Sequence, residues 1–262
     1  MQPLTTNASR LPVSGIDVRS REPTGEDEVL LAQASAHDIT LALEIARRLV
    51  HEIGGADLRW TELTATDLDA AILLVRQEAF GEIIDADAEC VQCRGRMNIV
   101  FRLSEYIAHH MPNRPRNVVP AKTEGWFCLS GTDVAFRIPT CADELAVVGH
   151  PQPEAELSRR CIDPAELGGR MFARVEKAME TMAPLLGDYL RAKCPVCEAD
   201  ADIRFEPREF AFRELCDQAA FIYDDVHLIA LAYHWSESEI LALPRSRRLR
   251  YAEMVRQSRN LG

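Results

Sequence analysis

The sequence predicts an α+β fold that is mostly helical and carries small β-hairpins. Three observations support this prediction. Several long segments repeat apolar residues at helical spacing. Two Cys-x-x-Cys motifs, at residues 90–93 and 194–197, each stand immediately before a segment with strand-like alternation. The flanks of the two motifs also resemble each other, so a motif, a strand and a helix recur in the same order in two parts of the chain.

Each Cys-x-x-Cys motif has the spacing of a zinc knuckle, in which a tight turn lets two thiolates bind one ion. We therefore expect one structural zinc per chain, held in a closed tetrahedral site by Cys90, Cys93, Cys194 and Cys197. An iron–sulfur cluster uses the same ligands and is the lesser alternative. Two unrelated buried or redox-active pairs are a further alternative, although a redox motif should follow a strand and open a helix.

The knuckles belong to an internal repeat, because residues 88–101 align with residues 192–205 without a gap. A helix-like segment follows each copy. The repeat predicts a split zinc ribbon, two knuckles each followed by a strand, with an inserted subdomain between its halves. The predicted domains are a flexible arm (1–10), an N-terminal part with a hairpin, helices and the first knuckle (11–111), an inserted α/β subdomain (112–182), and the second knuckle with the C-terminal helices (183–262).

Turn and capping signals predict the elements of the N-terminal part. A Ser-Gly turn between short apolar runs indicates a small hairpin. Thr24 and Asp27 form an N-cap pair, and Thr64 begins a helix that Gly81 ends. The predicted elements are a hairpin at 11–21 and helices to about Ala34, at 37–53 and at 68–80, followed after the first knuckle by a helix at 103–111.

The insert and the C-terminal part follow the same logic. Pro164 suits the first position of a helix, and Ser236 with Glu239 forms a capping box. Pro244 should separate the last two helices. The predicted elements are two strands within 126–138 around a Ser-Gly-Thr-Asp turn, a short helix capped by Thr140, helices at 154–161 and from Asp163-Pro164 to Met182, one long amphipathic helix at 210–233, and helices at 237–243 and 245–259.

Composition describes an ordinary acidic protein. The formal net charge is −11 and 47% of the residues are hydrophobic, which argues against nucleic-acid binding by bulk electrostatics. We find no signal peptide and no apolar run of the roughly 20 residues that span a bilayer. The expectation is a protein with reduced thiols in a cytoplasm and no membrane partner.

The sequence contains no recognisable catalytic set, so we expect no enzyme. It lacks paired nucleophile and base, a phosphate-binding glycine loop and the His-Glu-x-x-His pattern. A zinc held by four thiolates also has no bound water to activate. His109 or His110 could replace a cysteine ligand, but four thiolates already close the site. Cys128, Cys141, Cys161 and Cys216 lie in apolar or amphipathic contexts and are expected to pack in the core.

The last helix concentrates the basic charge of this acidic chain. We expect four of its arginines to lie at the surface and to face acidic groups of a partner protein, while Leu249 and Tyr251 pack inward. A solvated helix face is the plain alternative, and a helix-turn-helix contact with nucleic acid around Ser236 is another. The predicted partner-binding residues are Arg245, Arg247, Arg248 and Arg250.

Six stretches in this order resemble one protein family. They are Leu-Pro-x-Ser-Gly with Arg-Glu-Pro-Thr-Gly near the start, Thr-Ala-Thr-Asp with a helix ending in Phe80-Gly81, the first knuckle, Phe-Arg-Ile-Pro-Thr at 136–140, the second knuckle, and the segment 227–251. The chain is similar to baseplate hub or hub-assembly proteins of contractile phage tails and phage-tail-like contractile injection systems. In this chain Arg94 and Glu198 follow the second cysteine of each knuckle, where Gly is usual.

The resemblance implies a non-enzymatic structural or assembly component of a baseplate. Its implied partners are other baseplate, hub, spike or tube proteins, and it implies incorporation into the tail particle. The alternative function is a zinc-ribbon regulatory protein that binds nucleic acid through its Arg-rich C-terminal helix.

Overall fold

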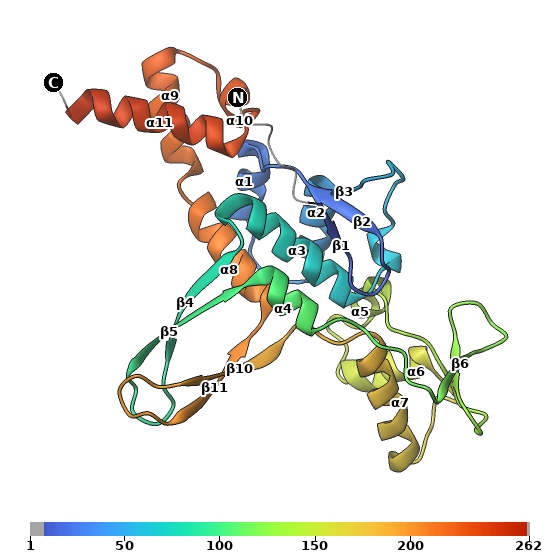
Figure 1. Cartoon of the computed structure of the whole chain (residues 1–262). Helices are drawn as coiled ribbons and strands as arrows, with labels where there is room; N and C mark the ends of the chain where they lie inside the picture. Colours follow the sequence, from blue (N-terminus) through green and yellow to red (C-terminus); the bar gives the residue numbers. More distant parts are fainter. Residues whose placement is uncertain (1–7, 261–262) are drawn as a thin grey trace.

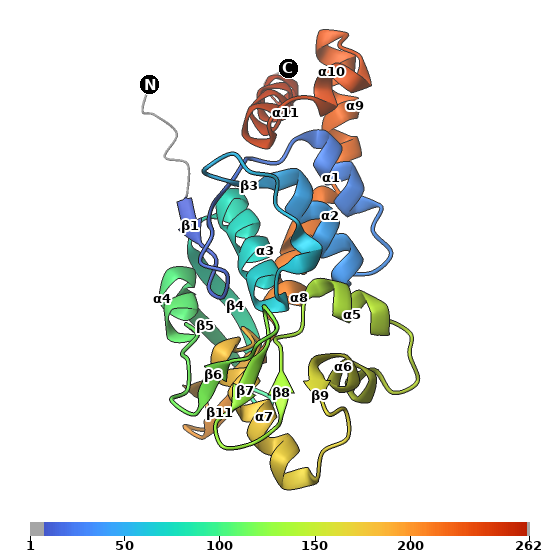
Figure 2. The same cartoon turned by 90° about the vertical axis from the view of Figure 1, so that its right-hand side faces the viewer.

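The computed structural model describes residues 8–260 and shows an α+β fold, about 48% helical with small antiparallel sheets. A helical body occupies the centre (Figure 1). Two β-hairpins project from the body as an arm, a lobe lies beside them, and the C-terminal helices lie at the opposite side (Figures 1 and 2).

The body is built around α3, whose residues 70–75 are all buried in one apolar core. Helices from both ends of the chain pack against it, and a small antiparallel sheet of order β1-β2-β3 covers one side. The body comprises β1 (Ala8–Arg10), β2 (Asp17–Ser20), α1 (Gly25–Ala32), α2 (Ile39–Leu49), β3 (Val50–Glu52), a 3-10 turn η1 (Trp60–Glu62), α3 (Ala65–Phe80) and α8 (Pro207–Ala219).

Capping residues fix the position of α3. The Thr64 hydroxyl accepts a hydrogen bond from the Asp67 amide, as the sequence predicts, and Gly81 ends the helix with a φ of 86°. The Asp67 carboxylate is fully buried and accepts from the amides of Val13 and Ser14 at 2.8 and 3.0 Å. The same short motif therefore starts the central helix and holds the turn of the first hairpin.

The arm consists of two antiparallel hairpins. The first joins β4 (Ile83–Glu89) to β5 (Arg96–Arg102), and α4 (Leu103–His109) follows it back to the body. The second joins β10 (Asp188–Lys193) to β11 (Asp200–Phe205), and α8 follows. At the base of the arm, Phe101 and Phe205 meet edge-to-face with ring centroids 5.2 Å apart, which places both hairpins on the body core.

The lobe has its own small core, formed by Leu129, Phe136, Val175 and their neighbours. Helix α5 is different, because Cys141 lies in the body core and its amide donates to the Leu63 carbonyl at 2.8 Å. The elements of this region are β6 (Val118–Pro120), β7 (Phe127–Leu129), β8 (Ala135–Phe136), α5 (Cys141–Val147), α6 (Pro153–Cys161), β9 (Ile162–Asp163) and α7 (Gly169–Met182), with sheet order β6-β7-β8-β9.

Several predicted elements are confirmed and several need correction. The capping boxes of Thr24, Thr140 and Ser236 all start helices as predicted. The predicted helix at 37–53 ends at Leu49, because the next three residues pair with β2 as a strand. The first hairpin starts earlier than predicted, since Ala8–Arg10 form β1; residues 1–7 of the predicted arm lie outside the described residues.

Two helix limits in the second half also differ. No helix starts at Pro164: Asp163 ends a strand that pairs with Ala135, and α7 begins at Gly169. The predicted helix at 210–233 is two helices, α8 and α9 (Ile222–Tyr233), separated at Ala220–Phe221. The break lets Leu215 pack into the body core while Ile229 packs against the last helix, two contacts that one straight helix would not make.

The C-terminal helices α9, α10 (Glu237–Leu241) and α11 (Arg245–Asn260) are joined to the body by buried ion pairs. Arg245 and Arg248 are 9% and 1% exposed, and both guanidinium groups contact the Glu28 carboxylate of α1. Arg248 also reaches Asp225 of α9 at 3.5 Å, and Arg256 contacts the same carboxylate at 2.7 Å. The prediction that Arg245 and Arg248 lie at the surface is therefore wrong.

Replacing Arg248 by Met should lower the free energy of unfolding by about 3–5 kcal/mol, because it leaves the buried Glu28 carboxylate without a main partner. Arg250 is exposed on the same helix, and its replacement by Met should cost less than about 0.5 kcal/mol. Urea unfolding of both variants measures the difference. Equal effects would contradict a structural role for the buried pair.

Candidate metal centre

The two knuckles adopt the same turn. In the first, the Arg94 amide donates to the Cys90 carbonyl and the Cys90 amide donates to the Gly95 carbonyl, both at 2.9 Å. In the second, the Glu198 amide donates to Cys194 and the Cys194 amide donates to Ala199, again at 2.9 Å. The internal repeat seen in the sequence is thus a repeat of backbone geometry.

The residue after each second cysteine has left-handed backbone. Arg94 has a φ of 59° and Glu198 a φ of 60°. This conformation costs a residue with a side chain roughly 1–2 kcal/mol, which explains why Gly is usual at this position. Both knuckles therefore keep the expected turn with Arg and Glu in place of Gly, and the surrounding hydrogen bonds hold the strained residues in place.

The tips of the two hairpins meet, so that four sulfurs from distant parts of the chain form one cluster (Figure 1). The Sγ atoms of Cys90 and Cys197 are 3.8 Å apart, and those of Cys93 and Cys194 are 3.6 Å apart. All four lie within 4.8 Å of one another. A tetrahedron with metal–sulfur bonds of about 2.3 Å has sulfur–sulfur edges of about 3.8 Å. The four cysteines are therefore close enough to hold one metal ion, and the pairs are too far apart for disulfides.

The electrostatics of the cluster favour a bound cation. The amides of Cys197 and Val196 lower the pKa of the Cys194 thiol to about 6. The Gly95 amide lowers the pKa of the Cys93 thiol. The sulfurs of Cys197, Cys194 and Cys90 have the opposite effect, which is larger in total and raises this pKa to about 12. Adjacent thiolates repel each other, so all four can ionise together only when a positive charge lies between them. Thiolates of this kind prefer soft or borderline ions such as Zn²⁺.

The packing beneath the sulfurs is shared by both hairpins. Cys90 and Cys194 are fully buried with Met97 and Ala201, which occupy equivalent positions of the repeat. The second cysteine of each pair is exposed. One sulfur of each knuckle is thus held by the protein while the other faces solvent, an arrangement that gives an ion a path to the cluster.

Gly95 is required where the knuckles touch. A Cβ at this position would lie 2.8 Å from Cγ2 of Val196 and 3.1 Å from Sγ of Cys93. The equivalent position of the second knuckle holds Ala199, so the requirement comes from the contact between the knuckles and not from the turn itself.

The neighbouring histidines do not join the sulfur cluster. His110 is buried at the base of the arm, where its Nδ1 faces the Tyr106 carbonyl at 2.8 Å and its Nε2 faces Asp188 at 3.2 Å. His109 is exposed and meets the His110 ring edge-to-face. Asp188 starts β10, whereas the cluster lies beyond the far end of that strand. The alternative in which His110 replaces a cysteine ligand is therefore wrong.

The four predicted partner-binding arginines divide into two pairs. Arg245 and Arg248 form ion pairs with a carboxylate of the same chain, while Arg247 and Arg250 are exposed. Tyr251 packs inward as predicted, against the rings of Tyr233 and Trp235. One sequence signal indicated the buried pairing: an aspartate, Asp225, stands on the apolar face of α9 between Ile222 and Ile229.

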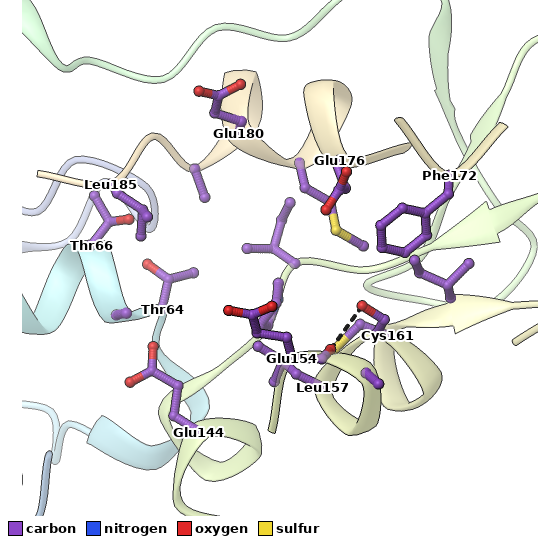
Figure 3. Close-up of a pocket in the computed structure, with 18 residues that line it drawn as sticks. Thr64, Thr66, Glu144, Glu154, Leu157, Cys161, Phe172, Glu176, Glu180 and Leu185 are labelled. Carbon is purple, nitrogen blue, oxygen red and sulfur yellow. Dashed lines mark hydrogen bonds between the residues drawn. The ribbon is translucent and has the colours of Figure 1, made fainter. Parts of the chain in front are cut away.

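A second candidate site is a cavity of about 520 Å³ between the start of α3 and the helices α6 and α7 (Figure 3). Cys161 lines it, but burial raises the pKa of this thiol to about 11, so the thiol stays protonated at neutral pH. Burial also raises the pKa of Glu144, another lining residue. The lining residues do not include a histidine to act as a general base.

Comparison with known proteins identifies a family. A family model described as T4 bacteriophage base plate protein matches residues 4–180. No curated protein and no solved structure matches the chain. The matched range contains the first hairpin of the arm and most of the lobe, and it ends before the second hairpin. None of the helices in residues 8–260 combines the length and the apolar composition of a membrane-spanning segment.

Replacing Gly95 by Ala should push the two knuckles apart and lower the free energy of unfolding by about 1–3 kcal/mol, the usual cost of overpacking. The thiols of the cluster should also react faster with a thiol-specific reagent. Adding Val196→Ala removes the closest clashing atom and should restore part of the loss. If G95A behaves like the wild type in both assays, the close contact between the knuckles is wrong.

Proposed function

Because a family model matches more than half of the chain, the protein belongs to the family of T4 bacteriophage base plate proteins. We propose that it is a non-enzymatic structural or assembly component of the baseplate of a contractile tail or tail-like injection system. Its partners are neighbouring baseplate, hub, spike or tube proteins. It is made in the bacterial cytoplasm and built into the particle there.

The observation that carries the structural proposal is the convergence of four cysteines from two knuckles. One zinc ion, bound by Cys90, Cys93, Cys194 and Cys197, makes the two hairpins a split zinc ribbon. The ion supplies no chemistry to a substrate, because four thiolates leave no open position. It links segments about a hundred residues apart and so offsets the entropy of closing that loop. An iron–sulfur cluster remains the lesser alternative for the same ligands.

The proposed limits of the insert and of the C-terminal part remain 112–182 and 183–262, while the N-terminal part includes residues 8–10 in addition to 11–111, because β1 pairs with β2. The small separate core of the lobe supports an inserted subdomain, and the contact of α5 with the body gives that insert one fixed attachment besides its ends. A baseplate subunit must keep its surfaces in fixed relative positions. The tip contact of the arm and the attachment of α5 both serve that requirement.

The exposed arginines of α11 provide a surface for an acidic partner. Arg247 and Arg250 carry this role in the present proposal, while Arg245 and Arg248 hold the helix in place. The nucleic-acid alternative loses support for the same reason, since two of the four guanidinium groups are occupied by carboxylates and the whole chain carries a charge of −11.

Purified protein should contain about one zinc per chain, and replacing Cys90 or Cys197 by Ser should reduce the zinc content sharply and lower the melting temperature. Cys216→Ser is the matched control, because Cys216 lies in α8 outside the cluster. Elemental analysis measures the metal, and cobalt substitution should give the absorption of a tetrahedral thiolate site. Wild-type protein that contains iron in place of zinc would support the iron–sulfur alternative. Wild-type protein without any metal would contradict the proposed metal site.

Replacing both Arg247 and Arg250 by Glu should prevent incorporation of the protein into tail particles, because like charges across an interface cost several kcal/mol. The melting temperature and the zinc content should stay close to those of the wild type, since both side chains are exposed. Immunoblots of purified particles measure incorporation. Normal incorporation of the variant would identify this helix face as merely solvated.

A further inference from the structure

The cavity between body and lobe has a mainly apolar lining (Figure 3). Its floor and walls include Ile138, Leu157, Ile162, Phe172, Met179 and Leu185. Leu185 is 65% exposed at its edge. The volume of about 520 Å³ lies within the range of binding pockets, roughly 300–1,000 Å³. Exposed apolar surface of this kind commonly marks an interaction site.

All the charged residues that line the cavity are acidic. They are Glu144, Glu154, Glu176 and Glu180. Glu144 lies 3.8 Å from Arg208, and Glu180 is paired with Lys177 at 2.9 Å. Among the described residues, neither Glu154 nor Glu176 has an ion-pair partner, and both are exposed. The rim therefore keeps a negative charge beside an apolar floor.

These features together define the ligand by its chemistry. A ligand with an apolar side chain would remove the apolar floor of the cavity from water, and a cationic group next to that side chain would neutralise the carboxylates of the rim. A phosphate or an acidic peptide would be repelled by the same carboxylates.

We propose that this cavity is a docking groove for an amphipathic segment of a neighbouring protein, which places apolar side chains against Leu157 and Met179 and Lys or Arg against Glu154 and Glu176. The identification of the neighbour as a baseplate protein rests on the proposed function, whereas the chemistry of the groove is independent of that function. Because α3 lies on one side and α6 and α7 on the other, an occupant contacts body and lobe together and fixes their relative orientation.

The groove can be tested on the full-length protein with three synthetic helical peptides labelled with fluorescein. The first has Leu at every third or fourth position with Lys between, the second has Glu in place of Lys, and the third has Ser in place of Leu. The first should bind with an affinity that falls as salt rises, because part of the attraction is between exposed charges. The other two should bind at least about tenfold more weakly, since each lacks one half of the required chemistry.

Two variants locate the binding. Ala155→Trp fills the groove and should abolish binding of the Leu/Lys peptide. Glu154→Gln with Glu176→Gln should weaken binding about tenfold, in line with the loss of two partly exposed ion pairs. The matched control, Glu105→Gln with Glu237→Gln, removes the same charge from exposed positions outside the groove and should change affinity less than about twofold.

A site-specific signal separates docking in the groove from general attraction to an acidic protein. With ¹³C-methyl methionine, the Met179 signal should shift on peptide addition while Met254, on α11, should not. A static Met179 signal at saturation, unchanged affinity of the A155W variant, or equal binding of the Glu or Ser peptide would overturn the groove. The baseplate role is tested separately by particle incorporation, so the two proposals can fail independently.

Discussion

The contact between the two hairpin tips is the constraint on which the arrangement of the molecule depends. The first hairpin leaves the body after α3, the second returns to it before α8, and the lobe lies between them in the sequence. The tips meet through four sulfurs and a small apolar cluster beneath them. Such a small contact buries little apolar area, so the proposed ion has a clear physical role in holding it closed.

A second long-range connection is made in the same way, by polar groups and not by a large apolar interface. The cluster of apolar residues within the C-terminal helices is small, and their ion-pair link to the body runs from Arg245 and Arg248 of α11 to Glu28 of α1. Buried ion pairs contribute little net stability but penalise every alternative that separates them. They therefore fix the position of the last helix, which leaves Arg247 and Arg250 on its outer side.

The parts of the fold that could be predicted depend on local chemistry. Capping residues such as Thr64 and Ser236 act within one helical turn, and the knuckle turn is complete within six residues, so the sequence indicates both. The parts that could not be predicted depend on contacts between distant segments. The strand at Val50–Glu52 exists because β2 lies beside it, and the burial of Arg248 requires Glu28, which is 220 residues away in the sequence.

The cavity between body and lobe belongs to this second class, since its walls come from four separate segments whose meeting no local pattern specifies. Its position also connects the two proposals. The lobe is attached to the body at α5 and at the ends of the insert, and the tip contact lies at the far end of the arm. A segment docked in the groove would add one more attachment, between α3 and α7. The docked segment would supply apolar contact at a junction that the free chain holds mainly through α5, and so it would add to the connection between body and lobe when the neighbour is in place.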